Sequence, residues 1–152
     1  MRMSEATKIE KEKVDKAFTG IINKLNYDLN TITRHMSPGK LKRYSKTYFT
    51  IERSNRKRQD LKSFIVYFNQ DIMQELTLTQ VKRHAFHEIL HAMTWPFVDE
   101  YEECTKYLKD QPDLYGELVS RAYDTRENVI YNMERSLGPI VLPECDWSEE
   151  TD

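Results

Sequence analysis

Residues 79–95 contain a motif of two histidines and a glutamate set inside a helical pattern. The run from His87 to His91 reads H-E-I-L-H, and apolar side chains recur around it at the spacing of a buried helix. Residues four apart on a helix lie on one face about one turn apart, so both imidazoles can reach one zinc ion. Glu88 lies about 100° round the helix from His87, beside the metal position, where it can take a proton from zinc-bound water.

The sequence also indicates where this helix begins and ends. Thr77 and Thr79 are candidate N-caps, and Pro96 predicts a sharp stop. The alternative interpretation of the motif is two core histidines and a surface glutamate on an ordinary helix. Because buried, unpaired imidazoles and carboxylates are costly, we favour the metal site.

A catalytic zinc site takes three protein ligands and leaves one position for water, so a third ligand is needed. His35 lies far off in the sequence, and nothing local ties it to the motif. His84 would lie about 10 Å along the helix axis from His91, too far for all three histidines to share one ion. We therefore interpret His84 as a residue that lines the cleft or bonds to the backbone. A carboxylate from a later helix is the other way to complete the site.

The rest of the chain predicts an α+β fold in a single domain. Apart from the motif helix, the predicted elements are a long amphipathic N-terminal helix over 4–35, strands over 47–53 and 62–68, and a last helix over 113–137. The two strands are expected to pair as an antiparallel hairpin. Residues 1–142 form the predicted domain, and residues 143–152 are predicted to be an acidic, disordered tail.

Charge is unevenly distributed although the net charge is only −2. Residues 1–86 carry 18 Lys and Arg against 9 Asp and Glu, whereas residues 87–152 carry 5 against 16. A basic cluster over residues 40–58 is either a solvated face or a surface for nucleic acid or an acidic partner. The chain has no apolar run of membrane-spanning length, no apolar leader and only two cysteines, which predicts a cytoplasmic protein that does not contact a membrane.

Two segments together resemble small phage and prophage proteins of the zinc metallopeptidase type. These are the motif with its continuation, H-E-I-L-H-A-M-T-W-P-F, and the run E-N-V-I-Y-N-M-E-R-S-L that begins at Glu127. With the strand 62–68 the likeness covers about half of the chain. Such proteins are similar to gluzincins and minigluzincins, in which a glutamate on a second helix completes the site. The resemblance implies a zincin-like fold, one Zn²⁺ per chain, a protein or peptide substrate and, for a phage protein, the host cytoplasm.

The same resemblance assigns roles to residues of the last helix. It makes Glu127 the third metal ligand, since Glu134 lies two turns further on, close to a helix end that we expect to fray. Tyr131 stands where larger gluzincins have an aspartate that orients a zinc histidine. That supporting role is then left to Asp99, Asp124 or a backbone carbonyl.

The mechanism implied by the resemblance is peptide hydrolysis. Glu88 acts as the general base and passes its proton to the leaving amine. Tyr131 is our choice among several candidates for stabilising the oxyanion, the others being Tyr123, Arg126 and Arg135. The strand 64–68 is expected to form the upper edge of the cleft and to pair with an extended peptide.

Two other functions are compatible with the sequence. One is a non-catalytic binding module that contains zinc and contacts nucleic acid weakly through residues 40–58. The other is a protease similar to SprT-like enzymes, which carry the same motif and act on proteins bound to DNA. The sequence leaves the oligomeric state and the cleavage preference open.

Overall fold

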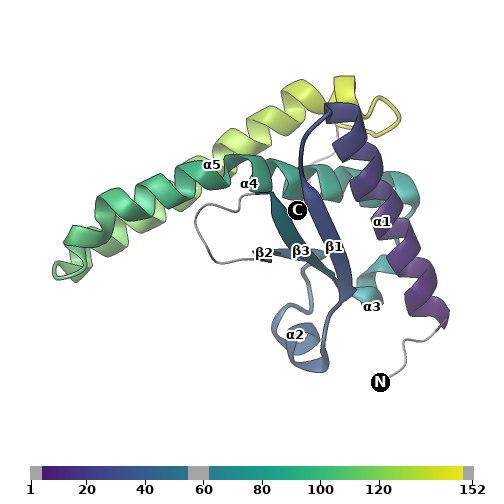
Figure 1. Ribbon diagram of the computed structural model, residues 1–152, viewed down its shortest axis with the longest axis horizontal. Coiled ribbons are helices and arrows are strands. Elements are labelled where there is room, and N and C mark those ends of the chain that lie inside the picture. Colours follow the sequence, from purple (N-terminus) through teal and green to yellow (C-terminus); the bar gives the residue numbers. More distant parts are fainter. Residues whose placement is uncertain (1–4, 55–61, 149–152) are drawn as a thin grey trace.

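The computed structural model describes residues 5–54 and 62–148. These residues form an α+β fold, as predicted, with five α-helices, one short 3-10 helix and a three-stranded sheet (Figure 1). In chain order the elements are α1 (Glu5–Leu25), β1 (Asn30–His35), α2 (Pro38–Arg43), β2 (Phe49–Arg53), β3 (Ser63–Phe68), α3 (Gln70–Met73), α4 (Leu78–Thr105), η1 (Lys106–Leu108) and α5 (Pro112–Val141).

The N-terminal helix is shorter than the predicted range of 4–35. It ends at Leu25, and Asn26 has a positive φ of 50°, a left-handed conformation that breaks the helix and that asparagine tolerates better than most residues. Residues 30–35 form the strand β1 instead. Their Thr-Ile-Thr run favours a strand because β-branched side chains fit a pleated sheet better than a helix.

The sheet has the order β1-β3-β2, with β1 parallel and β2 antiparallel to β3. The predicted antiparallel hairpin of β2 and β3 is therefore confirmed. The expectation that the strand 64–68 forms the edge of the cleft is wrong, because β3 is the central strand and is paired on both sides. Among the described strands, β1 and β2 are the ones with a free edge.

The core lies between one face of the sheet and the helices α1 and α4. Alternate residues of β3 are buried on this face, namely Phe64, Val66 and Phe68. Phe18 of α1 packs edge-on against Phe49 of β2, with 5.5 Å between the ring centroids. The helices α1 and α4 also contact each other directly. This packing fixes α4, which carries the motif, against the sheet.

Both long C-terminal helices continue through a proline, although Pro96 was predicted to end the first and the second was predicted to end at residue 137, before Pro139. The helix α4 begins at a capping box of Thr77 and Gln80, which confirms the predicted N-cap, and passes through Pro96. The helix α5 likewise passes through Pro139. The two helices lie against each other and extend together well beyond the sheet (Figure 1). Among the described residues no helix is apolar enough over a sufficient length to cross a membrane.

The segment after α5 differs from the predicted disordered tail. Leu142, Cys145 and Trp147 are buried, and the ring of Trp147 packs edge-on against Phe86 of α4, with 5.8 Å between the centroids. The indole Nε1 donates a hydrogen bond of 2.9 Å to the carbonyl of Leu142. A tryptophan buries enough apolar area to hold a short acidic segment on the core. Residues 149–152 lie outside the described part of the chain.

Candidate metal centre

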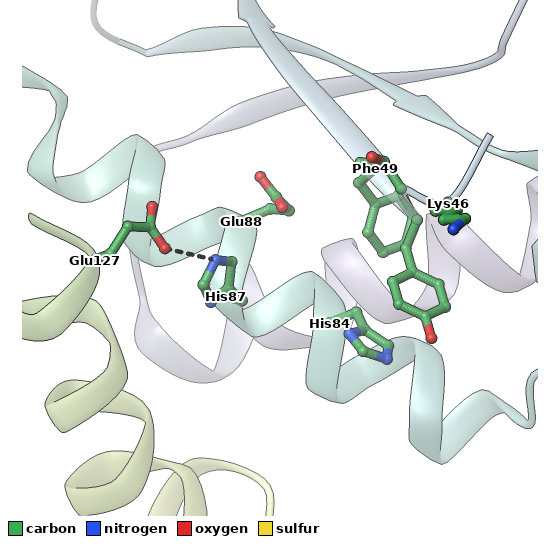
Figure 2. Close-up of a pocket in the computed structure, with 8 residues that line it drawn as sticks. Lys46, Phe49, His84, His87, Glu88 and Glu127 are labelled. Atoms are coloured by element: carbon green, nitrogen blue, oxygen red, sulfur yellow. Dashed lines mark ion pairs between the residues drawn. The ribbon is translucent and has the colours of Figure 1, made fainter. Parts of the chain in front are cut away.

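A cavity of about 330 Å³ opens between the start of β2 and the middle of α4 (Figure 2). It is lined by Lys46, Thr47, Tyr48, Phe49, His84, His87, Glu88 and Glu127. His84 lines this cavity, as predicted, and its ring stacks on Tyr48 with 4.0 Å between the centroids and 19° between the planes. The cavity therefore combines an aromatic wall with the polar residues of the motif.

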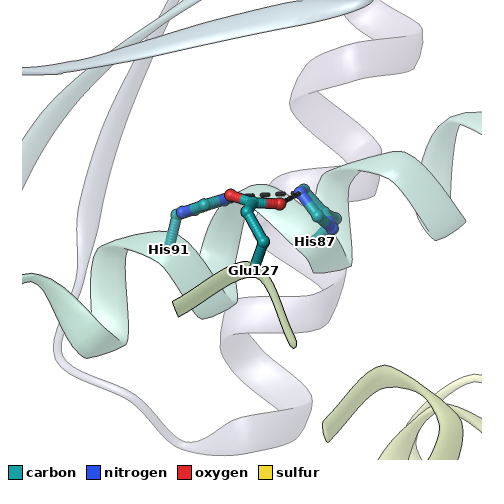
Figure 3. A group of neighbouring side chains, drawn as sticks. All are labelled: His87, His91 and Glu127. Atoms are coloured by element: carbon teal, nitrogen blue, oxygen red, sulfur yellow. Dashed lines mark hydrogen bonds and ion pairs between the residues drawn. The ribbon is translucent and has the colours of Figure 1, made fainter. Parts of the chain in front are cut away.

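At one side of this cavity α4 and α5 bring together His87, His91 and Glu127 (Figure 3). One ligand atom from each residue can be chosen so that all lie within 4.8 Å of one another. Glu127 Oε1 lies 3.0 Å from His91 Nε2, and Glu127 Oε2 lies 3.8 Å from His87 Nε2. The two Nε2 atoms are 3.1 Å apart.

These distances fit three ligands of one small cation. Zinc binds nitrogen and oxygen at about 2.0–2.2 Å, so neighbouring ligand atoms of a tetrahedral site are roughly 3.3–3.5 Å apart. Two neutral imidazoles that face each other through their Nε2 atoms repel unless a proton or a cation lies between them. The donor set of two imidazoles and one carboxylate suits zinc and also other first-row metals, so the residues define a site without identifying the metal.

Arg126 holds α5 at this position on α4. Its Nη2 donates a hydrogen bond of 2.8 Å to the carbonyl of His91, and its Nε donates one of 3.4 Å to Thr94 Oγ1. Its guanidinium also lies 5.1 Å from the centroid of the Trp95 ring. Because Arg126 directly precedes Glu127, these contacts fix where Glu127 lies along α4, opposite the two histidines.

Glu134 lies on the other side of His87. The Oε1 atom of Glu134 contacts His87 Nδ1, and Glu134 is only 3% exposed. Its predicted place near a fraying helix end is wrong, because α5 continues to Val141 and the segment after it is packed. Sequence reasoning missed this contact. The available signal was the spacing of Ile130, Glu134 and Gly138, which puts the carboxylate on the buried face of α5.

The residues predicted to support the histidines have other positions. Asp99 is buried and forms an ion pair of 3.0 Å with Arg53 of β2. Asp124 is exposed. Neither prediction is therefore met, since the contact to His87 comes from Glu134 instead. A carboxylate seven residues after Glu127 reaches the histidine because two helical turns bring it back to the same face.

Glu88 lines the cavity together with His87 and Glu127 (Figure 2). Burial raises the pKa of Glu88 to about 7, and the carboxylates of Glu127 and Glu134 add to the rise while His87 opposes it. Among the described residues, no Lys, Arg or His forms an ion pair with Glu88. A carboxyl group with this pKa can both accept and release a proton near neutral pH.

The histidines differ in their electrostatic surroundings. Burial, with the charges of His87 and Arg126, lowers the pKa of His91 to about 3. Burial also lowers the pKa of His84 to about 4, helped by Arg83 and His87. For His87 burial acts in the same direction, but the hydrogen bond and charge of Glu134 outweigh it and raise the pKa above 6.5. His91 is thus neutral at pH 7, the form that binds metals.

Tyr131 does not lie at the cavity. It is 42% exposed, and the guanidinium of Arg135 lies 5.0 Å from the centroid of its ring. Tyr131 is not among the described residues that line the cavity. Its contribution to an oxyanion site remains a prediction for which the geometry offers no support.

No protein-family model, curated protein sequence or solved structure matches this chain significantly. Its function is therefore inferred from its own residues, namely the geometry of the cluster, the cavity beside it and the chemistry of Glu88.

Proposed function

We propose that the protein is a zinc-dependent metallopeptidase of zincin-like fold that hydrolyses peptide bonds in proteins or peptides. The observation that carries this proposal is the meeting of His87, His91 and Glu127 at one point beside the carboxyl group of Glu88. Two histidines on one helix and a glutamate from another helix form the donor set of a hydrolytic zinc site, and the adjacent carboxyl group of Glu88 provides the base that such a site needs. The site also opens to a cavity that admits a substrate.

His87, His91 and Glu127 would hold the zinc ion, which would act as a Lewis acid that polarises the scissile carbonyl and lowers the pKa of a bound water. Glu88 accepts the proton of the attacking water and transfers it to the leaving amine. Its pKa of about 7 suits both transfers. His87, His91 and Glu127 come from rigid helices, so they keep the reacting groups at fixed distances.

The edge strand β2 supports an extended peptide as the substrate. The carbonyl of Tyr48 accepts a hydrogen bond from the N–H of Asn69, directly after β3, and the N–H of Ser54 donates one to the carbonyl of Ser63 at the start of β3. Along an antiparallel strand, successive residues direct their backbone N–H and C=O groups alternately towards and away from the neighbouring strand. The backbone groups of Phe49 and Ile51 therefore point away from β3. The strand β2 begins at the wall of the cavity. A peptide paired with this edge passes close to Glu88.

The proposal is tested by cleavage of an unfolded protein with wild type and with Glu88→Gln. We expect the wild type, supplied with zinc, to cleave, and Glu88→Gln to bind the same amount of zinc without measurable turnover. Glu102→Gln, at an exposed position of the same helix, is the matched control and should cleave like the wild type. Cleavage by Glu88→Gln at the wild-type rate, or no cleavage by the zinc-loaded wild type, would contradict the proposal.

A contact with nucleic acid is the second candidate function, either alone or together with cleavage of DNA-associated proteins. It is favoured by the exposed basic residues Lys42, Arg43 and Lys46 around α2, the last of which reaches the cavity. Within the described residues, Lys42 and Lys46 form no ion pair. Residues 56–58, which continue the basic cluster in the sequence, lie outside the described part. Backbone phosphates are the expected target of such a surface.

A further inference from the structure

Glu134 is a buried carboxylate with one defined partner. It is 3% exposed, and its Oε1 contacts Nδ1 of His87. A carboxylate removed from water needs a hydrogen-bond donor, because its desolvation is otherwise uncompensated. The nitrogen that meets this need is the one on the far side of the ring from Glu127 and His91.

The contact determines which nitrogen of His87 carries the proton. A neutral imidazole has one N–H and one unprotonated nitrogen. An ionised Glu134 can accept hydrogen bonds but cannot donate one, so it selects the form of His87 that has the proton on Nδ1. The lone pair of Nε2 is then free, and Nε2 is the atom that faces the other residues of the cluster.

We propose that Glu134 is the positioning residue of the metal centre, which holds His87 in the Nδ1–H tautomer and fixes the plane of its ring. This inference rests on the proposed function for the presence of a metal, but the contact itself belongs to the metal-free protein. The alternative position for such a residue on α5, four residues after Glu127, is occupied by the exposed Tyr131. Glu134 acts through His87 and is not among the described residues that line the cavity.

The packing around Glu134 explains how it can hold a histidine rigidly. Ile130 and Gly138, one turn before and one turn after it on α5, are both buried. Trp147 lies against Gly138, and Arg135 Nη1 donates a hydrogen bond of 2.7 Å to the carbonyl of Trp147. The C-terminal segment thus closes the side of α5 on which Glu134 lies and keeps water from its carboxylate.

The first test reads the tautomer of His87 in metal-free protein by ¹⁵N NMR, at a pH where His87 is neutral. In the wild type we expect the proton on Nδ1 and an unprotonated Nε2. Glu134→Gln keeps the shape of the side chain but can donate as well as accept, so the preference for this tautomer should be lost. A wild-type His87 with its proton on Nε2 would overturn the proposal, whether or not any variant folds.

The second test is zinc affinity, measured by competition with a chelator. Loss of the partner of a ligating histidine typically lowers metal affinity 10–100-fold, which is the range we expect for Glu134→Gln. Glu117→Gln, at an exposed position of the same helix, should bind within about twofold of the wild type. Glu134→Asp, which keeps the charge, should fall between the two.

These measurements distinguish a failure of the role of Glu134 from a failure of the proposed function. If Glu134→Gln binds zinc as Glu117→Gln does and keeps the tautomer, Glu134 has no positioning role and the proposed function stands. If the wild type binds no metal, the proposed function fails, and the role of Glu134 at a metal centre fails with it. The tautomer measurement then still decides whether the contact between Glu134 and His87 exists.

Discussion

The indole ring of Trp147 lies so close to Gly138 that α5 has no space for a side chain at this position. A Cβ atom on Gly138 would lie 2.5 Å from Cε2 of Trp147, well inside the distance that real Cβ atoms keep. Gly138 is followed by Pro139 within the helix, a pair that normally ends one. Here the glycine is required by the approach of the C-terminal segment, which also covers the neighbourhood of Glu134.

This relationship predicts opposite effects for two glycines of the same helix. Gly138→Ala forces Trp147 out of place and should lower the free energy of unfolding by about 1–3 kcal/mol. Gly116→Ala, where no atom lies within 4 Å of the added Cβ, should raise it by up to about 1 kcal/mol. Denaturant unfolding of both variants measures the difference. Equal stability of the two would show that the packing of Trp147 on α5 is not as described.

The pKa of His84 predicts a loss of stability in acid. Burial lowers its pKa in the folded state to about 4, from 6.5 in the unfolded chain. Between these values the unfolded state binds more protons, so the contribution of His84 is present above pH 6.5 and is lost as the pH falls towards 4. His84→Gln should therefore flatten the dependence of unfolding free energy on pH over this range in metal-free protein. His35→Gln, at an exposed position of β1, is the control. An unchanged profile for His84→Gln would exclude this source of acid sensitivity.

Arg126 links stability to the metal centre. Its hydrogen bonds to the His91 carbonyl and Thr94 join α5 to α4 next to Glu127. Arg126→Gln should cost roughly 1–3 kcal/mol of stability, since hydrogen bonds from charged groups are worth about that much, and should also weaken zinc binding. Arg121→Gln, whose side chain is 72% exposed, should change neither. Loss of stability with unchanged zinc affinity would mean that Arg126 does not set the position of Glu127.

The basic surface around α2 predicts a salt-dependent affinity for nucleic acid. Changing Lys42 and Lys46 to glutamate should weaken binding to duplex DNA and reduce the slope of log affinity against log salt by up to about 2, near 0.9 for each lost phosphate contact. The same change at Lys16 and Lys109, which are exposed on α1 and after η1, should have little effect. Equal binding by both double variants would identify the surface as merely solvated.

Local signals in the sequence predicted the parts of the site that lie on one element. The spacing of His87 and His91 places both on one face of any helix, and the capping box at Thr77 starts that helix where expected. The strands β2 and β3 were recognisable from their β-branched and aromatic residues. Glu127 was expected beside the histidines from a resemblance, and the structure places it there; its role as a ligand remains a prediction.

The parts that were missed depend on contacts between distant segments. The apolar spacing from Leu25 to Met36 fits a helix as well as a strand, and pairing with β3 decides for the strand β1. The spacing on α5 can place Glu134 on the buried face, but its partner His87, 47 residues away in the chain, is identified only when α5 lies on α4. The predicted helices were ended before or at a proline because proline lacks the N–H that a helical hydrogen bond needs. The packing of α4 and α5, which compensates for this loss, is not visible in the sequence.

Zinc titration of purified protein tests the metal centre itself, since the proposed catalysis requires a metal at His87, His91 and Glu127. We predict about one zinc per wild-type chain and a large loss of affinity in Glu127→Ala, with Glu117→Ala unchanged. Well under half an equivalent in the wild type after supplementation, or equal affinity of Glu127→Ala and Glu117→Ala, would contradict the account.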